Sequence, residues 1–366
     1  MWSFLKHFFE QRKSSKTSPF EKLLGQEKSD AIFHNLLVEN RVPGISVTIL
    51  QEGKVILQKG YGHANVESKT NIDPQKTLFR IASISKCITG LAFGKMVEEG
   101  LVHWDDSLFK YVPEYPQKRF DFTLRQLANH TAGIRGYRGK EFALNEPYSI
   151  EDSLKVFKND PLQFEPGKGY LYNSFDFVLL SLAMERAAGT PFETYVQEKV
   201  LLPLGMHDTI PEKANIADKV GVTERSRINH ASLKATNYTK SISGFREAVP
   251  VNNFYKLAGG GYLSTSADIA IMGKALLQQE LLDKKTYQEI LFNYPVKNPP
   301  IYYGLGFQVS KDASGRPYVG HVGSSVGAYT NFYVYPEQGT VVSILIHCTD
   351  PKVQADLDTA IQAIWD

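Results

Sequence analysis

The chain has 366 residues, of which 42% are hydrophobic and 12% aromatic, enough for the packed core of one large or two small domains. Its 41 basic and 39 acidic residues are interspersed and give a net charge of +2, which excludes the strongly basic footprint of a nucleic-acid-binding protein. Two cysteines exclude a disulfide framework, and the scattered histidines lack ligand spacing, so we expect no metal and no cofactor. The expected partner is a small-molecule or peptide substrate.

Residues 1–27 are predicted to form an N-terminal tail. The apolar start is interrupted by Lys6 and His7 before it reaches the length of an export signal, and no apolar run reaches the roughly 18 residues that span a bilayer. A short amphipathic helix in peripheral contact with a membrane is the alternative to a loosely docked tail. The sequence leaves the compartment undetermined and slightly favours the cytoplasm over the periplasm or the extracellular space.

Residue periodicity predicts strands near both ends of the chain and helices between them. A helix over 28–39 and a hairpin over 44–53 and 55–62 come first, and a buried helix then begins near Ser83 and ends at Gly100. Residues 221–256 are polar and are expected to be a long excursion bordering the site. The remaining predictions are helices over 124–129, 150–157, 175–188, 191–200 and 353–365, and strands over 307–310, 328–335 and 341–347.

This order of elements predicts one sheet assembled from both chain termini, with a helical insertion packed against it. The expected domain spans 28–366. Its sheet region covers about 28–100 and 257–366, and its helical insertion covers about 101–256. The active site is expected at the junction of the two parts.

The segment Arg80-Ile-Ala-Ser-Ile-Ser-Lys-Cys-Ile-Thr-Gly90 holds the most informative pair of residues. Ser83 and Lys86 lie three residues apart where a helix is about to start, so their side chains share one helical face. A serine becomes a nucleophile when a base takes its proton, and burial can lower the pKa of a lysine toward roughly 7–8, where it serves as that base. The pair predicts acyl transfer through a covalent serine intermediate.

The same spacing occurs a second time, in Ser107-Leu-Phe-Lys110. Pro113 and Pro116 follow it and cut short any helix, so we expect that serine in a surface turn. An ordinary N-cap serine beside a solvated lysine is the alternative interpretation of Ser83 itself.

Tyr172 is the candidate proton partner of Lys86. It follows the turn Glu165-Pro-Gly167 and precedes an apolar helix, a rigid position for a phenol. A half-buried aromatic that only fills space is the alternative.

Near the C-terminus, Tyr318-Val-Gly-His-Val-Gly-Ser-Ser-Val-Gly327 places His321 and a glycine-rich turn at a strand edge, where backbone can approach a substrate closely. We expect His321 to hydrogen-bond the substrate or the Tyr172 hydroxyl, although a lone histidine can also be structural. The N–H groups of Ser83 and Ser324 are expected to bind one oxyanion, each worth roughly 2.7–4 kcal/mol.

A rival nucleophile lies in the same stretch. Gly323-Ser-Ser-Val-Gly327 matches the Gly-x-Ser-x-Gly elbow of α/β-hydrolases, with Ser325 as the nucleophile. Such an elbow leads into a helix, whereas residues 328–335 read as an aromatic strand. The context therefore favours Ser83.

The motifs Ser83-Ile-Ser-Lys86, Tyr172 after a Pro-Gly turn and His321-Val-Gly323, in this order, resemble those of the serine β-lactamase and penicillin-binding-protein-like family. That family includes class C β-lactamases, D-Ala-D-Ala peptidases, D-aminopeptidases and related esterases. The resemblance implies an α+β fold of the β-lactamase/DD-peptidase type, with an antiparallel sheet flanked by helices and a mostly helical inserted subdomain. It runs from about residue 30 to the end and is also carried by 124–134, 204–209, 258–265 and 303–307.

Three segments are most similar to the LACTB-like serine hydrolases of this family: Gly133-Ile-Arg-Gly-Tyr137, Leu171-Tyr-Asn-Ser-Phe175 and Phe254-Tyr-Lys-Leu-Ala-Gly-Gly-Gly261. This similarity points toward peptidase chemistry.

Two departures from the family pattern affect the expected substrate. The family's Tyr-x-Asn is Tyr172-Asn173-Ser174 here, so the substrate-binding amide is replaced by the Ser174 hydroxyl or moved to Asn173. A literal Tyr-x-Asn over 329–331 lies out of order on a strand. His321-Val-Gly323 replaces the Lys-Thr-Gly of many lactamases, which suits peptidases and esterases better because histidine lacks a permanent charge for a carboxylate-bearing antibiotic.

The resulting hypothesis is a serine hydrolase that cleaves an amide or ester bond through a Ser83 acyl-enzyme, as a peptidase or esterase rather than an efficient β-lactamase. The alternative is a catalytically weak scaffold or ligand sensor that uses the same fold. The sequence leaves oligomer formation open.

Overall fold

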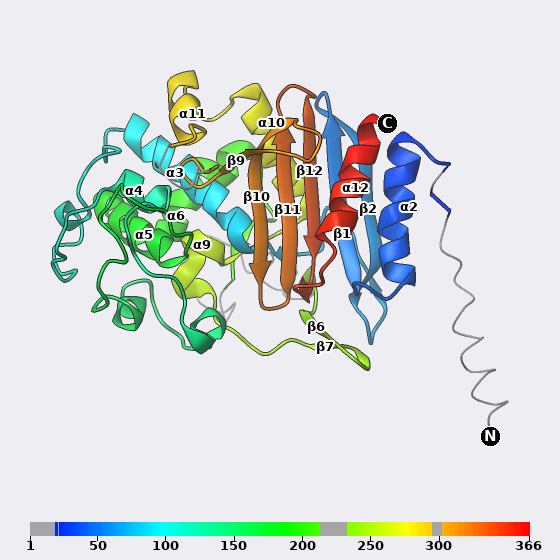
Figure 1. The fold of residues 1–366 in the computed structure, drawn as a ribbon, viewed down its shortest axis with the longest axis horizontal. Helices are drawn as coiled ribbons and strands as arrows, with labels where there is room; N and C mark the ends of the chain where they lie inside the picture. The colour runs from blue at the N-terminus through cyan, green and yellow to red at the C-terminus, as the bar shows by residue number, and fades with distance from the viewer. Residues whose placement is uncertain (1–18, 21, 213–232, 295–301) are drawn as a thin grey trace.

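A sheet of seven strands forms the centre of the molecule (Figure 1). The structure is a computed structural model that describes residues 19–20, 22–212, 233–294 and 302–366. The strand order is β3-β2-β1-β12-β11-β10-β9, and each neighbouring pair is antiparallel. Strands from both chain ends therefore share one sheet, as predicted. The strands are β1 (Gly44–Gln51), β2 (Lys54–Asn65), β3 (Thr70–Asn71), β9 (Gln308–Lys311), β10 (Pro317–Ser325), β11 (Ala328–Tyr335) and β12 (Thr340–Ile346).

Strands β1 and β12 join the two chain ends at the middle of the sheet. Their register pairs Ile45 with Ile346 and runs to Gln51 with Thr340. Both strands are buried along nearly their whole length because helices cover both faces, which explains their continuous apolar sequences.

Helices pack on both faces of this sheet (Figure 1). On the outer face, α2 and α12 contact each other and cover β1, β2 and β12 around a core that includes Phe33, Val47 and Leu357. On the inner face, α10 packs on β1 and β12, and its first residue, Ser266, bonds through Oγ to Ser46 Oγ at 2.8 Å and to Thr48 Oγ1 at 2.9 Å. Short hydroxyl side chains let this helix approach the sheet, and the hydroxyls of Ser46 and Thr48 both bond to that of Ser266.

The remaining helices form a mostly helical region beside the sheet, with α3 buried between the two parts. Eleven of the fourteen residues of α3 are buried, so it is enclosed on nearly all sides rather than amphipathic. The described helices are α2 (Gly25–Val38), α3 (Ser85–Glu98), α4 (Leu124–Ala128), α5 (Phe175–Ala188), α6 (Phe192–Val196), α7 (Leu202–Leu204), α9 (Leu257–Gly260), α10 (Ser266–Gln278), α11 (Lys284–Ile290) and α12 (Gln354–Gln362).

Short elements complete the description. Two small sheets have the orders β13-β6-β7 and β4-β8-β5. Their strands are β4 (Phe79–Arg80), β5 (Ile210–Pro211), β6 (Tyr238–Ser241), β7 (Gly244–Glu247), β8 (Tyr262–Ser264) and β13 (Cys348–Thr349). The 3₁₀ turns are η1 (Ala82–Ile84), η2 (Leu108–Lys110), η3 (Gly139–Ala143), η4 (Asp152–Val156), η6 (Phe254–Lys256) and η7 (Ala363–Trp365), and η5 (Gln197–Leu201) is a π-helical turn.

Two local predictions were wrong. The stretch 318–327 is not a glycine-rich turn at a strand edge: residues 317–325 form β10, and only Val326 and Gly327 turn the chain into β11. Residues 150–157 form the 3₁₀ turn η4 instead of an α-helix. Of the predicted excursion over 221–256, residues 221–232 lie outside the described part of the chain.

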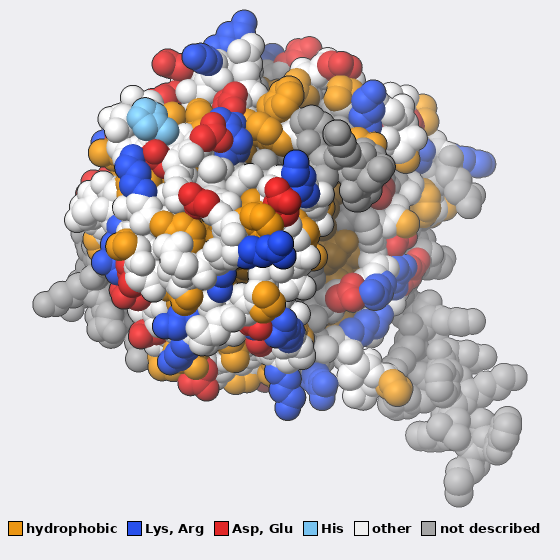
Figure 2. All heavy atoms as spheres, turned by 60° about the vertical axis from the view of Figure 1, so that its left-hand side comes forward, with side chains coloured by type: hydrophobic (Ala, Val, Ile, Leu, Met, Phe, Trp, Pro, Cys, Tyr) orange, Lys and Arg blue, Asp and Glu red, His pale blue; other side chains and the backbone are white. Residues whose placement is uncertain are grey.

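The surface carries no concentrated charge on the face drawn in Figure 2, where basic and acidic side chains are interspersed. None of the helices in the described ranges has the length and apolar character needed to cross a membrane.

We predict that Leu357→Ala lowers the free energy of unfolding by about 2–5 kcal/mol, because this fully buried side chain of α12 fills the core between α12 and the sheet. Urea denaturation followed by circular dichroism measures the change. Thr359→Ala, at an exposed position of the same helix, is the control and is expected to change stability by less than about 0.5 kcal/mol. Equal effects of the two substitutions would contradict the placement of α12.

Candidate active site

Ser83 lies in the 3₁₀ turn η1, just before α3, rather than in the first turn of the α-helix. The preceding residue, Ala82, has φ = 46°, a left-handed conformation that is rare for an alanine. Such backbone strain persists only where surrounding contacts enforce it, and it concentrates at functional sites. Here it turns the Ser83 side chain into a small pocket of about 60 Å³.

Lys86 is fully buried beneath Ser83. Its Nζ lies 3.2 Å from Ser83 Oγ, 2.7 Å from the Gly259 carbonyl and 3.5 Å from Ser174 Oγ. Burial, followed by the charge of Lys256, lowers the pKa of Lys86 to about 7. A neutral amine can donate to Gly259 and Ser174 and keep its lone pair for the Ser83 hydroxyl proton.

Tyr172 completes a three-residue cluster with Ser83 and Lys86. Its hydroxyl donates to Ser83 Oγ at 2.7 Å, and Lys86 Nζ lies 4.9 Å from its ring centroid. Desolvation of the hydroxyl raises the pKa of Tyr172, although 39% of the residue is exposed. The phenol is therefore suited to donate a proton, while Lys86 is the group suited to accept one.

The residues that follow Tyr172 point in different directions. Ser174 lines the pocket and contacts Lys86. The Asn173 side chain is buried and bonds to the carbonyls of Ile134 and Leu171 and to Asp176. The prediction that Asn173 contacts substrate was therefore wrong, since both ends of its amide are used to hold the start of α5.

Lys256 is a pocket residue that sequence reasoning missed. It lies at the end of η6, is 6% exposed, and donates to the Phe142 carbonyl at 3.1 Å. Burial, followed by the charge of Arg80, lowers its pKa to about 8. It is therefore mostly charged at neutral pH and disfavours a second charge on Lys86. Only its place inside the quoted segment 254–261 hinted at a role.

His321 lies on β10, with its ring 5.7 Å from that of Tyr172. Its Nδ1 donates to the Val322 carbonyl at 2.6 Å, so Nε2 is unprotonated and accepts from the Tyr303 hydroxyl at 3.0 Å. Burial, followed by the charge of Lys86, lowers the pKa of His321 to about 3. The predicted bond to the Tyr172 hydroxyl is therefore replaced by one to Tyr303.

Behind Tyr172 lies a second buried pair that sequence reasoning did not single out. His130 Nδ1 is 2.9 Å from Asp176 Oδ2, both side chains are fully buried, and the His130 ring lies 4.6 Å from the Tyr172 ring. Burial lowers the pKa of His130 well below its usual value and raises that of Asp176. The hydrogen-bonded pair packs behind Tyr172 and supports its ring. Its only sequence signal was that His130 falls within the quoted segment 124–134.

The backbone of β10 offers a candidate oxyanion donor beside Ser83. The Val322 N–H points toward the β9 edge, where it bonds to Gln308 Oε1 at 3.1 Å. The Ser324 N–H, two residues on, points to the same edge, but β9 pairs with β10 only as far as Gly320. Ser324 also lines the pocket with Ser83, so its N–H faces the space where a substrate carbonyl would lie.

Gly323 lets β10 approach the nucleophile turn. A Cβ at this position would lie 2.8 Å from the Ile81 carbonyl and 3.0 Å from Ala82 Cβ. Any side chain would push Ser324 away from Ser83. Gly323 therefore acts through backbone placement.

The rival motifs do not assemble a site. Ser325 lines the pocket mouth, but it ends a strand that turns into another strand, so the elbow context is absent. Ser107 caps the surface turn η2, as predicted, and Lys110 bonds to Asp106 instead. Tyr329 and Asn331 lie on β11 and bond to Gln354 of α12, on the sheet face that points away from Ser83.

Comparison with known proteins places this geometry in a family. A family model described as Beta-lactamase matches residues 29–364. The chain belongs to the β-lactamase family. Human "Serine beta-lactamase-like protein LACTB, mitochondrial" is 29% identical to this chain in an alignment 408 residues long. The alignment covers 85% of this chain and 72% of that protein. The predicted family is thereby confirmed.

Two solved structures have the same fold as this chain. The octameric penicillin-binding protein homologue from Pyrococcus abyssi has a TM-score of 0.77 at 27% identity and covers 92% of this chain and 77% of its own. The D-amino acid amidase from Ochrobactrum anthropi SV3, complexed with D-phenylalanine, has a TM-score of 0.78 at 20% identity. That match covers 92% of this chain and 98% of the amidase chain. The β-lactamase/DD-peptidase-like α+β fold predicted from the sequence is confirmed.

We predict that kcat/KM for an activated ester rises with pH through about 7, as Lys86 loses its proton, and that Lys256→Met moves this rise to higher pH. The substitution removes a positive charge that disfavours protonated Lys86 while keeping the apolar part of the side chain. Stopped-flow pH–rate profiles measure the midpoint. The exposed Lys140→Met is the control, and an unmoved midpoint in Lys256→Met would contradict the electrostatic role of Lys256.

Proposed function

We propose that this protein is a serine hydrolase that cleaves amide or ester bonds through a Ser83 acyl-enzyme. The observation that carries the proposal is the position of Ser83 Oγ, 3.2 Å from a lysine whose pKa is lowered to about 7 and 2.7 Å from the Tyr172 hydroxyl. A base whose pKa lies near neutral pH, and which is therefore partly unprotonated there, then lies against the hydroxyl it must activate. Membership of the β-lactamase family supports the same reaction class.

In the proposed reaction, the Ser83 proton passes to the Lys86 amine while Oγ bonds to the substrate carbonyl carbon. The carbonyl electron pair moves onto its oxygen, which the N–H groups of Ser83 and Ser324 stabilise. As the tetrahedral intermediate collapses, the leaving group takes a proton from Tyr172, and Tyr172 regains one from the Lys86 ammonium. Water then attacks the acyl carbon while one of its protons passes to the Lys86 amine. As this second tetrahedral intermediate collapses, the bond from carbon to Ser83 Oγ breaks and the Lys86 ammonium returns the proton to Oγ, which restores the free enzyme.

The proposed substrate class is a peptide-like amide or a short ester rather than a β-lactam. Ser174 occupies the position of the family's asparagine but contacts Lys86, so its short hydroxyl reaches less far into the pocket than an amide would. His321 is neutral and bonded to Tyr303, so it offers no permanent charge to an antibiotic carboxylate. The fold shared with a D-amino acid amidase makes amino acid amides a reasonable first set of substrates.

We predict that a fluorophosphonate forms one covalent adduct with the wild-type protein and that Ser83→Ala abolishes this adduct. The same substitution is expected to lower the turnover of a short-chain p-nitrophenyl ester by at least about 10³-fold. Intact-protein mass spectrometry and peptide mapping locate the adduct. Ser325→Ala, which changes a serine at the mouth of the same pocket, is the matched control and keeps labelling. An adduct that survives Ser83→Ala would overturn the assignment.

The same experiment addresses the scaffold alternative. A scaffold or sensor would fold and assemble without a burst, an adduct or turnover. Particle size measured by light scattering on the same sample records assembly, which the octameric Pyrococcus abyssi homologue makes worth testing. Amides of D- and L-phenylalanine, a β-lactam and short esters, compared with Ser83→Ala as the blank, then rank the substrate classes.

A further inference from the structure

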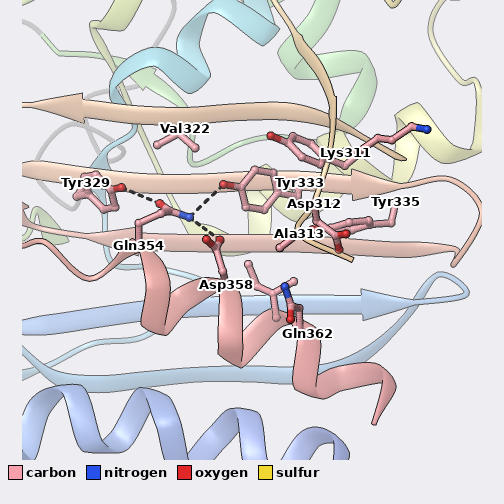
Figure 3. A pocket seen from close by; sticks show the side chains of 12 residues that line it. Lys311, Asp312, Ala313, Val322, Tyr329, Tyr333, Tyr335, Gln354, Asp358 and Gln362 are labelled. Atoms are coloured by element: carbon pink, nitrogen blue, oxygen red, sulfur yellow. Dashed lines mark hydrogen bonds between the residues drawn. The ribbon is translucent and has the colours of Figure 1, made fainter. Parts of the chain in front are cut away.

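A second pocket lies on the outer face of the sheet, on the opposite side of β10 from Ser83. Side chains alternate along a strand, so His321 and Gly323 face the active site while Tyr318 and Val322 face outward. The outer pocket lies between strands β9, β10 and β11 and helix α12 (Figure 3). Its volume of about 320 Å³ is within the range of small-ligand sites. Its lining residues are Lys311, Asp312, Ala313, Tyr318, Val322, Tyr329, Tyr333, Tyr335, Gln354, Asp358, Ile361 and Gln362.

Four tyrosines give this pocket an aromatic wall. Tyr318 of β10 packs edge-on to Tyr333 of β11, with ring centroids 4.8 Å apart, and its centroid lies 5.9 Å from that of Tyr335. Tyr329 continues the same face of β11 and bonds to Gln354 at 2.6 Å. Aromatic faces carry partial negative charge and attract cations, above all organic ammonium groups.

Asp358 of α12 supplies a carboxylate opposite these rings (Figure 3). It is half-buried and accepts a hydrogen bond from Gln354 Nε2 at 2.7 Å, and among the described residues it has no ion-pair partner. Its charge contributes to the raised pKa of all four tyrosines, in each case after burial. The carboxylate and the four rings line the same pocket.

The nearest cations are used elsewhere or lie outside. Arg316 bonds to Asp312 at 2.7 Å and lies 4.0 Å above the Trp365 ring, so Asp312 is neutralised within the protein. Lys311 is exposed at the pocket rim. Asp358 is thus the lining carboxylate that remains without a counter-charge.

We propose that this pocket binds a small organic cation, a primary or quaternary ammonium compound, with the ammonium group between Asp358 and the tyrosine rings. Gln354, bonded to Tyr329, Tyr333 and Asp358, orients the carboxylate and the rings around it. The site is separate from Ser83, and the proposal stands whatever the outcome of the hydrolase tests.

The experiment is isothermal titration calorimetry with choline chloride on the full-length protein at fixed ionic strength, compared with its neutral isostere 3,3-dimethyl-1-butanol. We expect saturable binding of choline, binding of the isostere that is at least about tenfold weaker, and a similar loss of choline affinity in Asp358→Asn. The matched control is Asp356→Asn, which removes a charge from the same helix but one that pairs with Arg41; it is expected to bind choline like wild type. Lys311→Met, which removes a competing cation, is expected to bind choline at least as tightly.

The proposal fails if choline shows no saturable binding, if the isostere binds equally well, or if Asp358→Asn binds like wild type while its melting temperature is unchanged. Tyr318→Leu gives an independent check, because it removes a half-buried ring without touching the carboxylate and is expected to weaken choline binding. Sedimentation with phosphatidylcholine vesicles distinguishes the sources of the ammonium group: association that depends on Asp358 indicates a lipid headgroup, and its absence alongside choline binding indicates a free amine.

Discussion

The burial of Lys86 is the constraint on which the rest of the site depends. Moving the pKa of a lysine from 10.5 to about 7 means that the folded protein disfavours the charged form by roughly 5 kcal/mol. Helix α3 is enclosed on nearly all sides, so the amine is buried and meets the active-site pocket through Ser83 and Ser174. The hydroxyls of Ser83 and Ser174 and the carbonyl of Gly259 satisfy its hydrogen bonds instead. A group that is costly to bury is kept because it is then a base near neutral pH.

The surroundings of Lys86 follow from this requirement. Lys256 adds a second positive charge that opposes protonation, while His321 and His130 are held neutral by burial. Tyr172 stays protonated for the same reason and donates to Ser83. These five residues come from distant parts of the chain and share a low-dielectric environment. That environment lowers the pKa of the proton acceptor, Lys86, and raises the pKa of the proton donor, Tyr172.

Local patterns predicted the parts of the site that depend on short-range spacing. Ser83 and Lys86 are one turn apart, and α5 begins and ends at the predicted residues because its apolar period and Gly189 define it. The direction of the Asn173 side chain was not predictable, since it depends on the carbonyls of Ile134 and Leu171. Tyr303 and Lys256 come from segments that no local spacing connects to Ser83. Strand β10 was missed because its glycines suggested a turn, whereas Gly320 permits close contact with β11 and Gly323 with η1.

The two faces of β10 give the sheet two separate chemical environments. The inner face carries His321 and Gly323 toward the active site, and the outer face carries Tyr318 and Val322 toward the second pocket. Alternation along a strand makes this possible without any additional element. On this outer face α12 packs in the core over β1 and β12 and also lines the second pocket beside β11.

The most direct test of the central claim is the titration of Lys86 itself. In protein labelled with ¹³C at lysine Cε, the Lys86 resonance is identified by its absence in Lys86→Met, and its chemical shift is followed with pH. Our account predicts a midpoint near 7. A midpoint near the 10.5 of an ordinary lysine would contradict the claim that Lys86 is the buried neutral base beside Ser83.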